Sequence, residues 1–273
     1  MARPHDSHRE REQSPLRTRR KMERSSLRLM SIISFVALAM ASSPAAAVDL
    51  YGKGNVFVSD AEGQSSGQTT FFPLTGSDDD QSPAYGGALG VSFSLEEALT
   101  KIDRVPVPRW RVRLELEGTW GRDYEFRTSG GDGFFTEVEA DTIIPSIWLE
   151  VPVHEPVSWI FGRVPILEPL RLYGGGGVGW ADIDIATTDN ISSGSDSTSE
   201  SATQWGAGIS YDLTRNVTWS LGYRQVDLGD LEVNLMNGPT SFGTYELELD
   251  SSEITTGMEV RFFSFSLPGF GKD

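Results

Sequence analysis

Arginine and glutamate alternate with apolar residues in the stretch RWRVRLELEGTW, which runs from Arg109 to Trp120. This two-residue period is that of a β-strand with two unlike faces. Later segments carry further arginine and glutamate residues on one face in the same way. Side chains of opposite charge that share an enclosed face can form ion pairs. We therefore predict an interior charge network that contains Arg111, Arg113, Glu115, Glu117, Arg224, Glu259 and Arg261.

Two roles are open for this network. Its charges can hold one another and fill a narrow interior, or they can line a polar conduit or gate. We favour the first role because the strand pattern described below predicts a barrel of eight strands, and such a barrel leaves an interior just wide enough for side chains. The predicted partners are Arg111 or Arg113 with Glu259, and Glu115 or Glu117 with Arg224 or Arg261.

Catalytic chemistry finds little support in the sequence. His154 is the only histidine after residue 47, and it stands between prolines in EVPVHEPV. A catalytic triad needs its base within hydrogen-bond reach of a nucleophile that packing holds in place. No serine of the chain has a recognisable nucleophile context, so we predict no catalytic residues and no enzyme activity.

Acidic runs raise the question of a metal site. Asp78, Asp79 and Asp80, with Asp189 and Asp196 further on, carry oxygen ligands that suit Ca²⁺. Their spacing does not match the DxDxDG calcium loop. The chain also has no cysteine, which excludes disulfides and Cys-ligated metals. We expect solvated acidic loops, without a metal site or a cofactor.

Residues 1–47 have the order of a secretory signal peptide. A basic stretch that ends near Arg28 leads into an apolar run from Leu29 to Ala41, and small residues at Ala45 to Ala47 follow. The run is too short to cross a membrane as a helix. Met22 is an alternative start. We expect residues 1–47 to be a leader and signal peptide that is cleaved on export, and residues 48–273 to be the mature domain.

The charge balance argues against nucleic acid. Residues 1–47 hold 9 of the 23 Lys and Arg but only 4 of the 39 Asp and Glu. Residues 48–273 therefore carry 14 basic and 35 acidic side chains, a formal charge of −21. Since nucleic-acid binding depends on phosphate neutralisation by Lys and Arg, the composition excludes this class of partner.

Strand-like alternation recurs after Val48, and no segment shows a long 3.6-residue apolar period. In PAYGGALGVSFSL and QWGAGISYDL, for example, large apolar residues occupy one parity and mainly small or polar residues the other. Such runs, bounded by turn residues, predict eight strands. The expected ranges are roughly 49–58, 83–95, 109–122, 136–151, 169–185, 204–213, 217–224 and 254–262.

The small or polar second face decides between two architectures. A soluble sandwich must cover each apolar face with a second sheet. A small membrane barrel instead turns its apolar face to lipid and crowds its interior with Gly, Ser and paired charges. Glycines in LYGGGGVGW relieve such crowding. We predict an all-β fold, an eight-stranded antiparallel transmembrane up-and-down β-barrel.

Aromatic residues near the strand ends predict two girdles. Ten residues at about 3.3 Å each, tilted by about 40°, rise roughly 25 Å, near the height of the apolar band of such a barrel. The competing interpretation, a soluble core, remains open because alternation alone does not distinguish lipid from a second sheet. The girdle residues are Trp110, Trp120, Trp180, Tyr211 and Trp219.

The connections alternate in character, as those of a barrel with two different ends should. Thr214 to Asn216 is a tight turn, whereas the connections at 96–108 and 152–169 are longer than simple periplasmic turns. We expect both termini in the periplasm and long polar loops at the cell exterior. The expected loops are residues 59–82, 123–135, 186–203 and 227–250.

From about Val48 to Phe265 the chain resembles the OmpA/OmpX/OmpW class of small outer-membrane barrels. The matching residues are RLYGGGGVGWA, YDLTRNVTWSLGYRQV and the aromatic-ended last strand GMEVRFF. The resemblance implies a place in the cell outer membrane, contact with lipid and lipopolysaccharide, and recognition of the last strand by the barrel-assembly machinery. The chain departs from the class by continuing past its terminal aromatic residues into SFSLPGFGKD.

Taken together, these features predict a non-enzymatic barrel with a structural or interaction role at the cell surface, in adhesion or envelope integrity. Its acidic loops are the expected contact for an extracellular ligand. The alternative is a narrow OmpW-like channel for small molecules. A lipid-modifying outer-membrane enzyme is the third alternative.

Overall fold

The computed structural model describes residues 47–69, 73–95, 110–128, 133–154, 164–189 and 191–266. They all belong to one compact unit, Pro44–Asp273. Apart from Ala47, the predicted leader lies outside the described residues. In the described ranges, no helix is long and apolar enough to cross a membrane.

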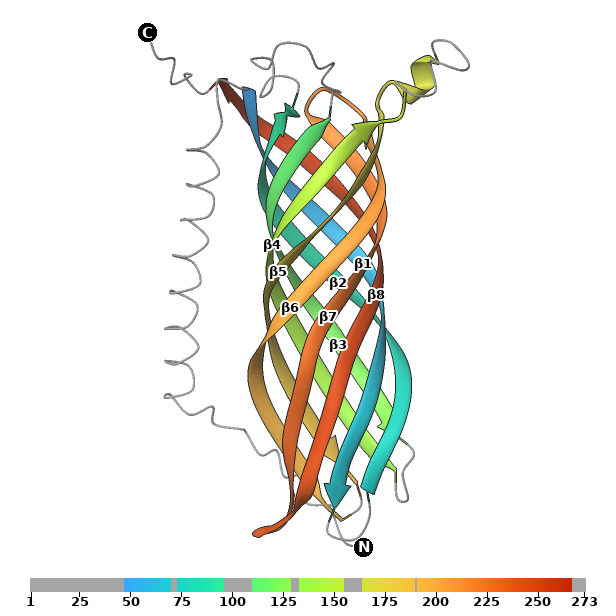
Figure 1. Cartoon of the computed structure of the whole chain (residues 1–273), viewed down its shortest axis with the longest axis vertical. Coiled ribbons are helices and arrows are strands. Elements are labelled where there is room, and N and C mark those ends of the chain that lie inside the picture. The colour runs from blue at the N-terminus through green and yellow to red at the C-terminus, as the bar shows by residue number, and fades with distance from the viewer. Residues whose placement is uncertain are drawn as a thin grey trace, which may run out of the picture. The chain divides into compact units, whose positions relative to one another are not determined.

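Eight antiparallel strands form a closed ring, in which each strand pairs with its neighbours in sequence and β8 pairs with β1 (Figure 1). The predicted eight-stranded antiparallel barrel is confirmed. The strands are β1 (Ala47–Thr69), β2 (Pro73–Ser94), β3 (Arg111–Thr128), β4 (Phe134–Pro152), β5 (Leu170–Thr188), β6 (Ser193–Asp212), β7 (Val217–Asn237) and β8 (Thr240–Ser266).

The two ends of the ring are called the base and the tip. The base holds the start of β1, the end of β8 and the β6–β7 turn, and it is uppermost in Figure 1. The tip holds the connections β1–β2, β3–β4, β5–β6 and β7–β8. A single 3₁₀ turn, Pro165–Leu167, precedes β5 at the base.

The predicted long loops were wrong. Residues 59–82, 123–135, 186–203 and 227–250 largely continue the strands, and the connections at the tip shorten to residues 70–72, 129–133, 189–192 and 238–239. The longer connections, β2–β3 and β4–β5, lie at the base instead. Loop length therefore does not orient the barrel. A strand such as β7, with 21 residues, rises about 50 Å at about 3.3 Å per residue and a tilt of about 40°, roughly twice the apolar band.

In the base half, the outward face is apolar and the inward face polar. Leu89, Val178 and Ile254 are 66%, 63% and 61% exposed on the outside of the ring. Ser210 and Glu253 are fully buried inside it. This is the arrangement of a barrel wall that faces lipid.

In the tip half, the chemistry of the two faces is exchanged. Along β8, buried Leu247 and Leu249 alternate with exposed Glu248 and Asp250. Two residues later the inward positions become polar, and Ile254 is the first large apolar residue on the outside. The inward parity stays the same through the change. The apolar cluster of the tip includes Tyr124, Phe126, Phe134, Val138, Ile183, Ile185, Leu228, Leu231, Val233, Leu235, Tyr245, Leu247 and Leu249.

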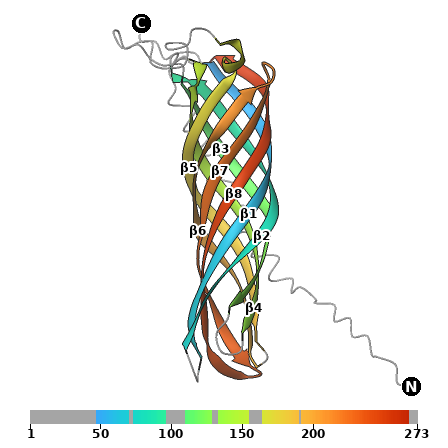
Figure 2. The ribbon, with the colours of Figure 1, turned by 90° about the vertical axis from the view of Figure 1, so that its right-hand side faces the viewer.

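Two ladders of the ring are interrupted in the tip half. The β2–β3 register ends at Tyr85–Trp120, and the β6–β7 register has no pairs between Thr203–Asp227 and Ser193–Met236. The tip thus consists of two four-stranded sheets, β7–β8–β1–β2 and β3–β4–β5–β6, which Ser193–Met236 still joins near the end of the tip (Figure 2 shows the course of the strands). The apolar cluster lies between them. A closed membrane barrel passes into a sandwich-like arrangement along the same strands.

A labelling experiment tests this exchange of faces, because the chain contains no native cysteine. In proteoliposomes, a lipid-soluble maleimide should label the variants Ile254→Cys and Met258→Cys. A water-soluble maleimide should label Glu248→Cys and leave Leu247→Cys unmodified. Equal labelling of residues 247 and 248 by the water-soluble reagent would show a solvated loop and contradict the apolar tip.

Candidate functional site

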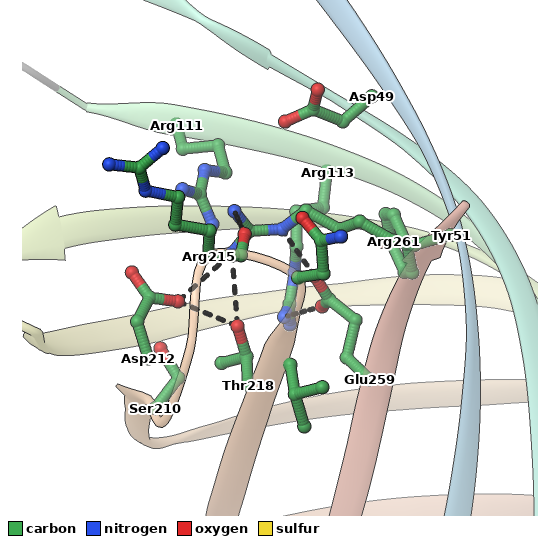
Figure 3. Close-up of polar contacts among 12 residues, drawn as sticks. Asp49, Tyr51, Arg111, Arg113, Ser210, Asp212, Arg215, Thr218, Glu259 and Arg261 are labelled. Carbon is green, nitrogen blue, oxygen red and sulfur yellow. Dashed lines mark hydrogen bonds and ion pairs between the residues drawn. The ribbon is translucent and has the colours of Figure 1, made fainter. Parts of the chain in front are cut away.

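The lumen of the base half contains a series of buried ion pairs. In the level nearest the mouth at the base, Arg261 Nη2 lies 2.9 Å from Asp212 Oδ1, and Arg171 Nε lies 3.5 Å from Asp212 Oδ2 (Figure 3 shows Arg261 and Asp212). Arg261 also donates to Thr218 Oγ1 at 3.0 Å. Arg111 Nη1 lies 3.2 Å from Glu150 Oε2. These contacts connect β3, β4, β5, β6, β7 and β8 across the mouth of the lumen.

Arg113 is the centre of the next level. Its Nη1 lies 3.0 Å from Glu150 Oε1 and 3.2 Å from Glu259 Oε2, and its Nε lies 3.3 Å from Glu115 Oε1. The Tyr51 hydroxyl donates to the same Glu115 oxygen at 2.8 Å. Arg113 is 1% exposed. One guanidinium is thus surrounded by three carboxylates, which is the compensation that a buried charge requires.

Glu253 is the centre of the third level, the one nearest the tip. Arg122 Nε donates to Glu253 Oε1 at 2.7 Å, and Arg224 donates to Glu253 Oε2 and to Glu117. The Arg224 guanidinium also lies 4.0 Å from the centre of the Phe57 ring, on the face of its π-system. These residues lie next to the apolar cluster of the tip, so the polar and apolar parts of the interior meet here.

The structure brings some of the predicted partners together and separates others. Of the predicted pairs, Arg113 meets Glu259 and Arg224 meets Glu117. Arg111 pairs with Glu150 rather than with Glu259. The neighbours of Arg261 are Asp212 and Glu259, and Glu115 pairs with Arg113 of its own strand. The prediction omitted five members: Arg122, Glu150, Arg171, Asp212 and Glu253.

The omitted members had different signals in the sequence. Glu253 lies on the same parity as Glu259, and the predicted strand began one residue too late to include it. Arg122 has the parity of the outward residues of its strand. A register shift between Thr119 and Arg122, with Gly121 at φ 79°, turns Arg122 inward. A bulge of this kind favours glycine, but alternation alone does not reveal it.

The network contains equal numbers of basic and acidic side chains. Among the described residues, its ion pairs involve six arginines (Arg111, Arg113, Arg122, Arg171, Arg224 and Arg261) and six acids (Glu115, Glu117, Glu150, Asp212, Glu253 and Glu259). A balanced set leaves no excess charge to select ions. On the tip side of this network, the apolar cluster fills the interior of the tip. The interior is therefore occupied by two chemically different layers.

The predicted girdle residues lie on the outer wall. Trp120 is 41% exposed and packs against Tyr85, with ring centres 6.4 Å apart, where the base half meets the tip half. Trp180, 37% exposed, is aligned with Ile143 of β4 near the same boundary. Tyr211 and Trp219 are register partners beside the β6–β7 turn at the base, and Trp110, directly before β3, is half-buried.

The outer surface of the tip is strongly acidic. Carboxylates lie opposite one another across neighbouring strands, an arrangement that destabilises a sheet. A groove of about 780 Å³ lies on this surface, with Ser66, Glu232, Glu246 and Glu248 in its lining. The opposed pairs include Glu62–Asp79, Glu62–Asp250, Asp227–Asp250, Asp230–Glu248, Glu232–Glu246, Glu125–Glu137 and Asp123–Glu139.

The aspartates considered for a metal site and His154 lie outside the ion-pair network. Asp78 and Asp80 lie in β2, where their carboxylates accept hydrogen bonds from backbone N–H groups of β3, so the solvated-loop interpretation was wrong for them. In the described part of the chain, no group of three or more His, Cys, Asp or Glu side chains is placed to hold a metal ion. His154 follows β4 at the base, and its Nδ1 is buried without a hydrogen-bond partner.

Comparisons with known proteins agree with this architecture. The family profile described as "Outer membrane protein beta-barrel domain" matches residues 33–262. Similar solved structures include OprG from Pseudomonas aeruginosa (13% identity, 81% of this chain and 97% of that chain, TM-score 0.46) and Ail of Yersinia pestis (14%, 77% and 99%, 0.34). The outer-membrane protease OmpT from Escherichia coli is also similar (9%, 78% and 97%, 0.40). No curated protein sequence matches the chain.

Removal of the charge at Glu253 tests the network. Glu253→Gln leaves Arg122 and Arg224 without their shared carboxylate, and losing one partner of a buried pair costs about 3–5 kcal/mol. Urea unfolding in lipid vesicles should show this loss. The exposed Glu248→Gln on the same strand is the matched control; it relieves the like-charge contact with Asp230 and should raise stability by about 0.2–1 kcal/mol rather than lower it. Equal effects of the two variants would contradict a buried network.

The acidic tip predicts a pH effect at Asp250. Burial raises the pKa of this carboxyl group, and the carboxylates of Asp227, Glu62 and Asp230 raise it further. A raised pKa means that the contribution to stability is complete below the ordinary value, about 3.9, and is lost as the pH rises through the raised value. Asp250→Asn should therefore stabilise the protein at pH 7 by about 0.2–1 kcal/mol, the range for a cross-strand pair.

The same substitution should lose its stabilising effect as the pH falls through and then below the ordinary value of about 3.9, because the carboxyl group becomes protonated in the folded and then the unfolded form. Asp60→Asn serves as the control, because Asp60 is aligned with the uncharged residues Gln81 and Ser252. Unfolding free energies measured across this pH range check the prediction. A stabilisation by Asp250→Asn that does not change with pH would contradict like-charge repulsion as its cause.

Proposed function

Because the chain belongs to the outer-membrane β-barrel family and its place is therefore the outer membrane, we propose that it is a non-enzymatic, closed barrel with a structural or interaction role at the cell surface. The observation that supports this role is the filled interior. Arg113, Arg122 and Glu253 are at most 1% exposed inside the base half. The tip interior is apolar and equally buried.

The tip is the proposed contact surface. We place it outside the cell and the base toward the periplasm. The reason is that the start of β1 and the end of β8 both lie at the base, and a signal peptide before β1 would deliver the chain to the periplasmic side. Extended strands carry the acidic surface well beyond the apolar band. An extracellular partner of this surface should be positively charged at its contact, and the groove beside Glu232 and Glu246 offers a concave place for it.

Other proposed partners follow from the membrane position. Lipid surrounds the apolar wall of the base half, and lipopolysaccharide lies next to the acidic tip, where divalent cations would bridge the two anionic surfaces. The barrel-assembly machinery would receive the chain through its last strand. Export would remove residues 1–47 as a cleaved signal peptide.

The channel is the competing function, and the polar residues of the base lumen are the observation in its favour. A conduit needs a continuous water path. The carboxylates and guanidinium groups that would line such a path are held against one another by the ion pairs around Arg113 and Glu253. We therefore expect no steady passage of ions or small polar molecules in the resting protein.

Planar-bilayer recordings test this choice. The refolded parent protein should show little or no steady conductance. Arg224→Ala together with Glu259→Ala removes members of both central levels and leaves space with unpaired charge, so it should produce openings or an unstable baseline. The exterior pair Glu232→Ala and Glu248→Ala is the control and should remain closed. A large, stable conductance of the parent that the lumen substitutions barely change would favour the channel.

A further inference from the structure

On the tip side of Trp120, β2 and β3 are no longer joined by backbone register pairs. Backbone register pairs run from Ser94–Arg111 to Tyr85–Trp120 and stop there. In the tip half, Pro73–Ala84 of β2 faces Arg122–Thr128 of β3 without a backbone register pair, and this contact is called the β2/β3 seam. Each backbone N–H group of β3 that points across the seam therefore needs another acceptor.

Side chains of β2 supply these acceptors at every second position. The three pairs continue the alignment of Tyr85 with Trp120, so the strands keep their register. Carboxylate and hydroxyl oxygens take the place of backbone carbonyls. The bonds run from the N–H of Asp123 to Ser82 Oγ (3.2 Å), of Glu125 to Asp80 Oδ2 (2.8 Å) and of Arg127 to Asp78 Oδ2 (2.6 Å).

These bonds are weaker links than the ladders beside them. β2 is joined to β1 by backbone pairs up to Gln68–Pro73, and β3 is joined to β4 up to Thr128–Phe134. The bonds to Asp78 and Asp80 are exposed to water, which competes for donor and acceptor. Exposed hydrogen bonds with few neighbours are where a native structure opens first.

The interruption on the opposite side, between β6 and β7, is tightly packed. A Cβ atom on Gly194 of β6 would lie 2.6 Å from Val233 Cγ1 and 2.7 Å from the carbonyl oxygen of Asn234, both in β7. The strands are thus in direct contact beside Ser193–Met236, the register pair that joins β6 and β7 near the end of the tip. Such a contact allows two sheets to change their angle while they remain in touch.

We propose that the tip opens and closes along the β2/β3 seam, with Asp78 and Asp80 as latches and the β6–β7 contact as the hinge. In the closed form Tyr124 and Phe126 alternate with the latched N–H groups of β3 and are 1% and 0% exposed. The open form exposes these rings and the apolar cluster behind them. This motion of the tip is independent of whether the base lumen conducts.

Amide hydrogen exchange in the folded full-length protein tests the proposal. In the parent, the amides of Asp123, Glu125 and Arg127 should exchange faster than amides at the same height in the β1–β8 ladder. Asp78→Ala together with Asp80→Ala should accelerate exchange at Glu125 and Arg127 by about ten-fold or more, the effect of losing charge-assisted hydrogen bonds. Asp79→Ala is the matched control, because Asp79 is exposed and aligned with Glu62 of β1.

A second double variant keeps the test informative if the alanine variant does not fold. Asp78→Asn together with Asp80→Asn keeps an acceptor oxygen without its charge, so the acceleration should be smaller but confined to the same amides. Two results would overturn the proposal: unchanged exchange at Glu125 and Arg127 in every latch variant, or acceleration that is equal in the β1–β8 ladder. The first would mean that the side chains do not hold the seam, and the second that the whole tip loosens.

Discussion

In a closed barrel each strand keeps one inward face along its length, and the rest of this structure depends on that constraint. The strands are about twice as long as an apolar band requires, so they pass from lipid into water with one face always inward. The inward parity is kept through the change in β8 and shifts at bulges in β3, between Thr119 and Arg122, and in β7, between Asp227 and Asp230. The faces must then exchange chemistry. On β8 the exchange falls between Leu249, buried among apolar side chains, and Glu253, buried among arginines.

This exchange explains why the interior has two layers. In the base half the outside must be apolar, and the crowded inside is satisfied by compensating charges such as Arg113 with Glu259. In the tip half the outside is hydrated, so the inside can hold an ordinary apolar core. Without lipid around it, the tip also tolerates interrupted ladders, since water and side chains satisfy the backbone groups that a bilayer would leave unpaired.

The sequence predicts the base half well because its signals are local. Alternation from Arg111 to Glu117 identifies a strand and its charged face directly. The tip was mistaken for loops for two reasons. In β7, Leu231, Val233 and Leu235 do alternate with polar residues, but the acidic composition suggested a loop. In β6, Ser193–Ser201 has few apolar residues on either face, so only its pairing with β5 makes it a strand. Such tertiary pairing is not readable from one segment.

Contact between water and the leucines of the tip tests the central claim most directly. Solid-state NMR of the protein in lipid bilayers can measure the rate at which magnetisation passes from water to individual methyl groups. The account predicts slow transfer to Leu228, Leu231, Leu247 and Leu249, and fast transfer to Leu213, which is 52% exposed at the base turn. Transfer to the tip leucines as fast as to Leu213 would mean hydrated loops and would contradict a dry core that continues the barrel beyond the membrane.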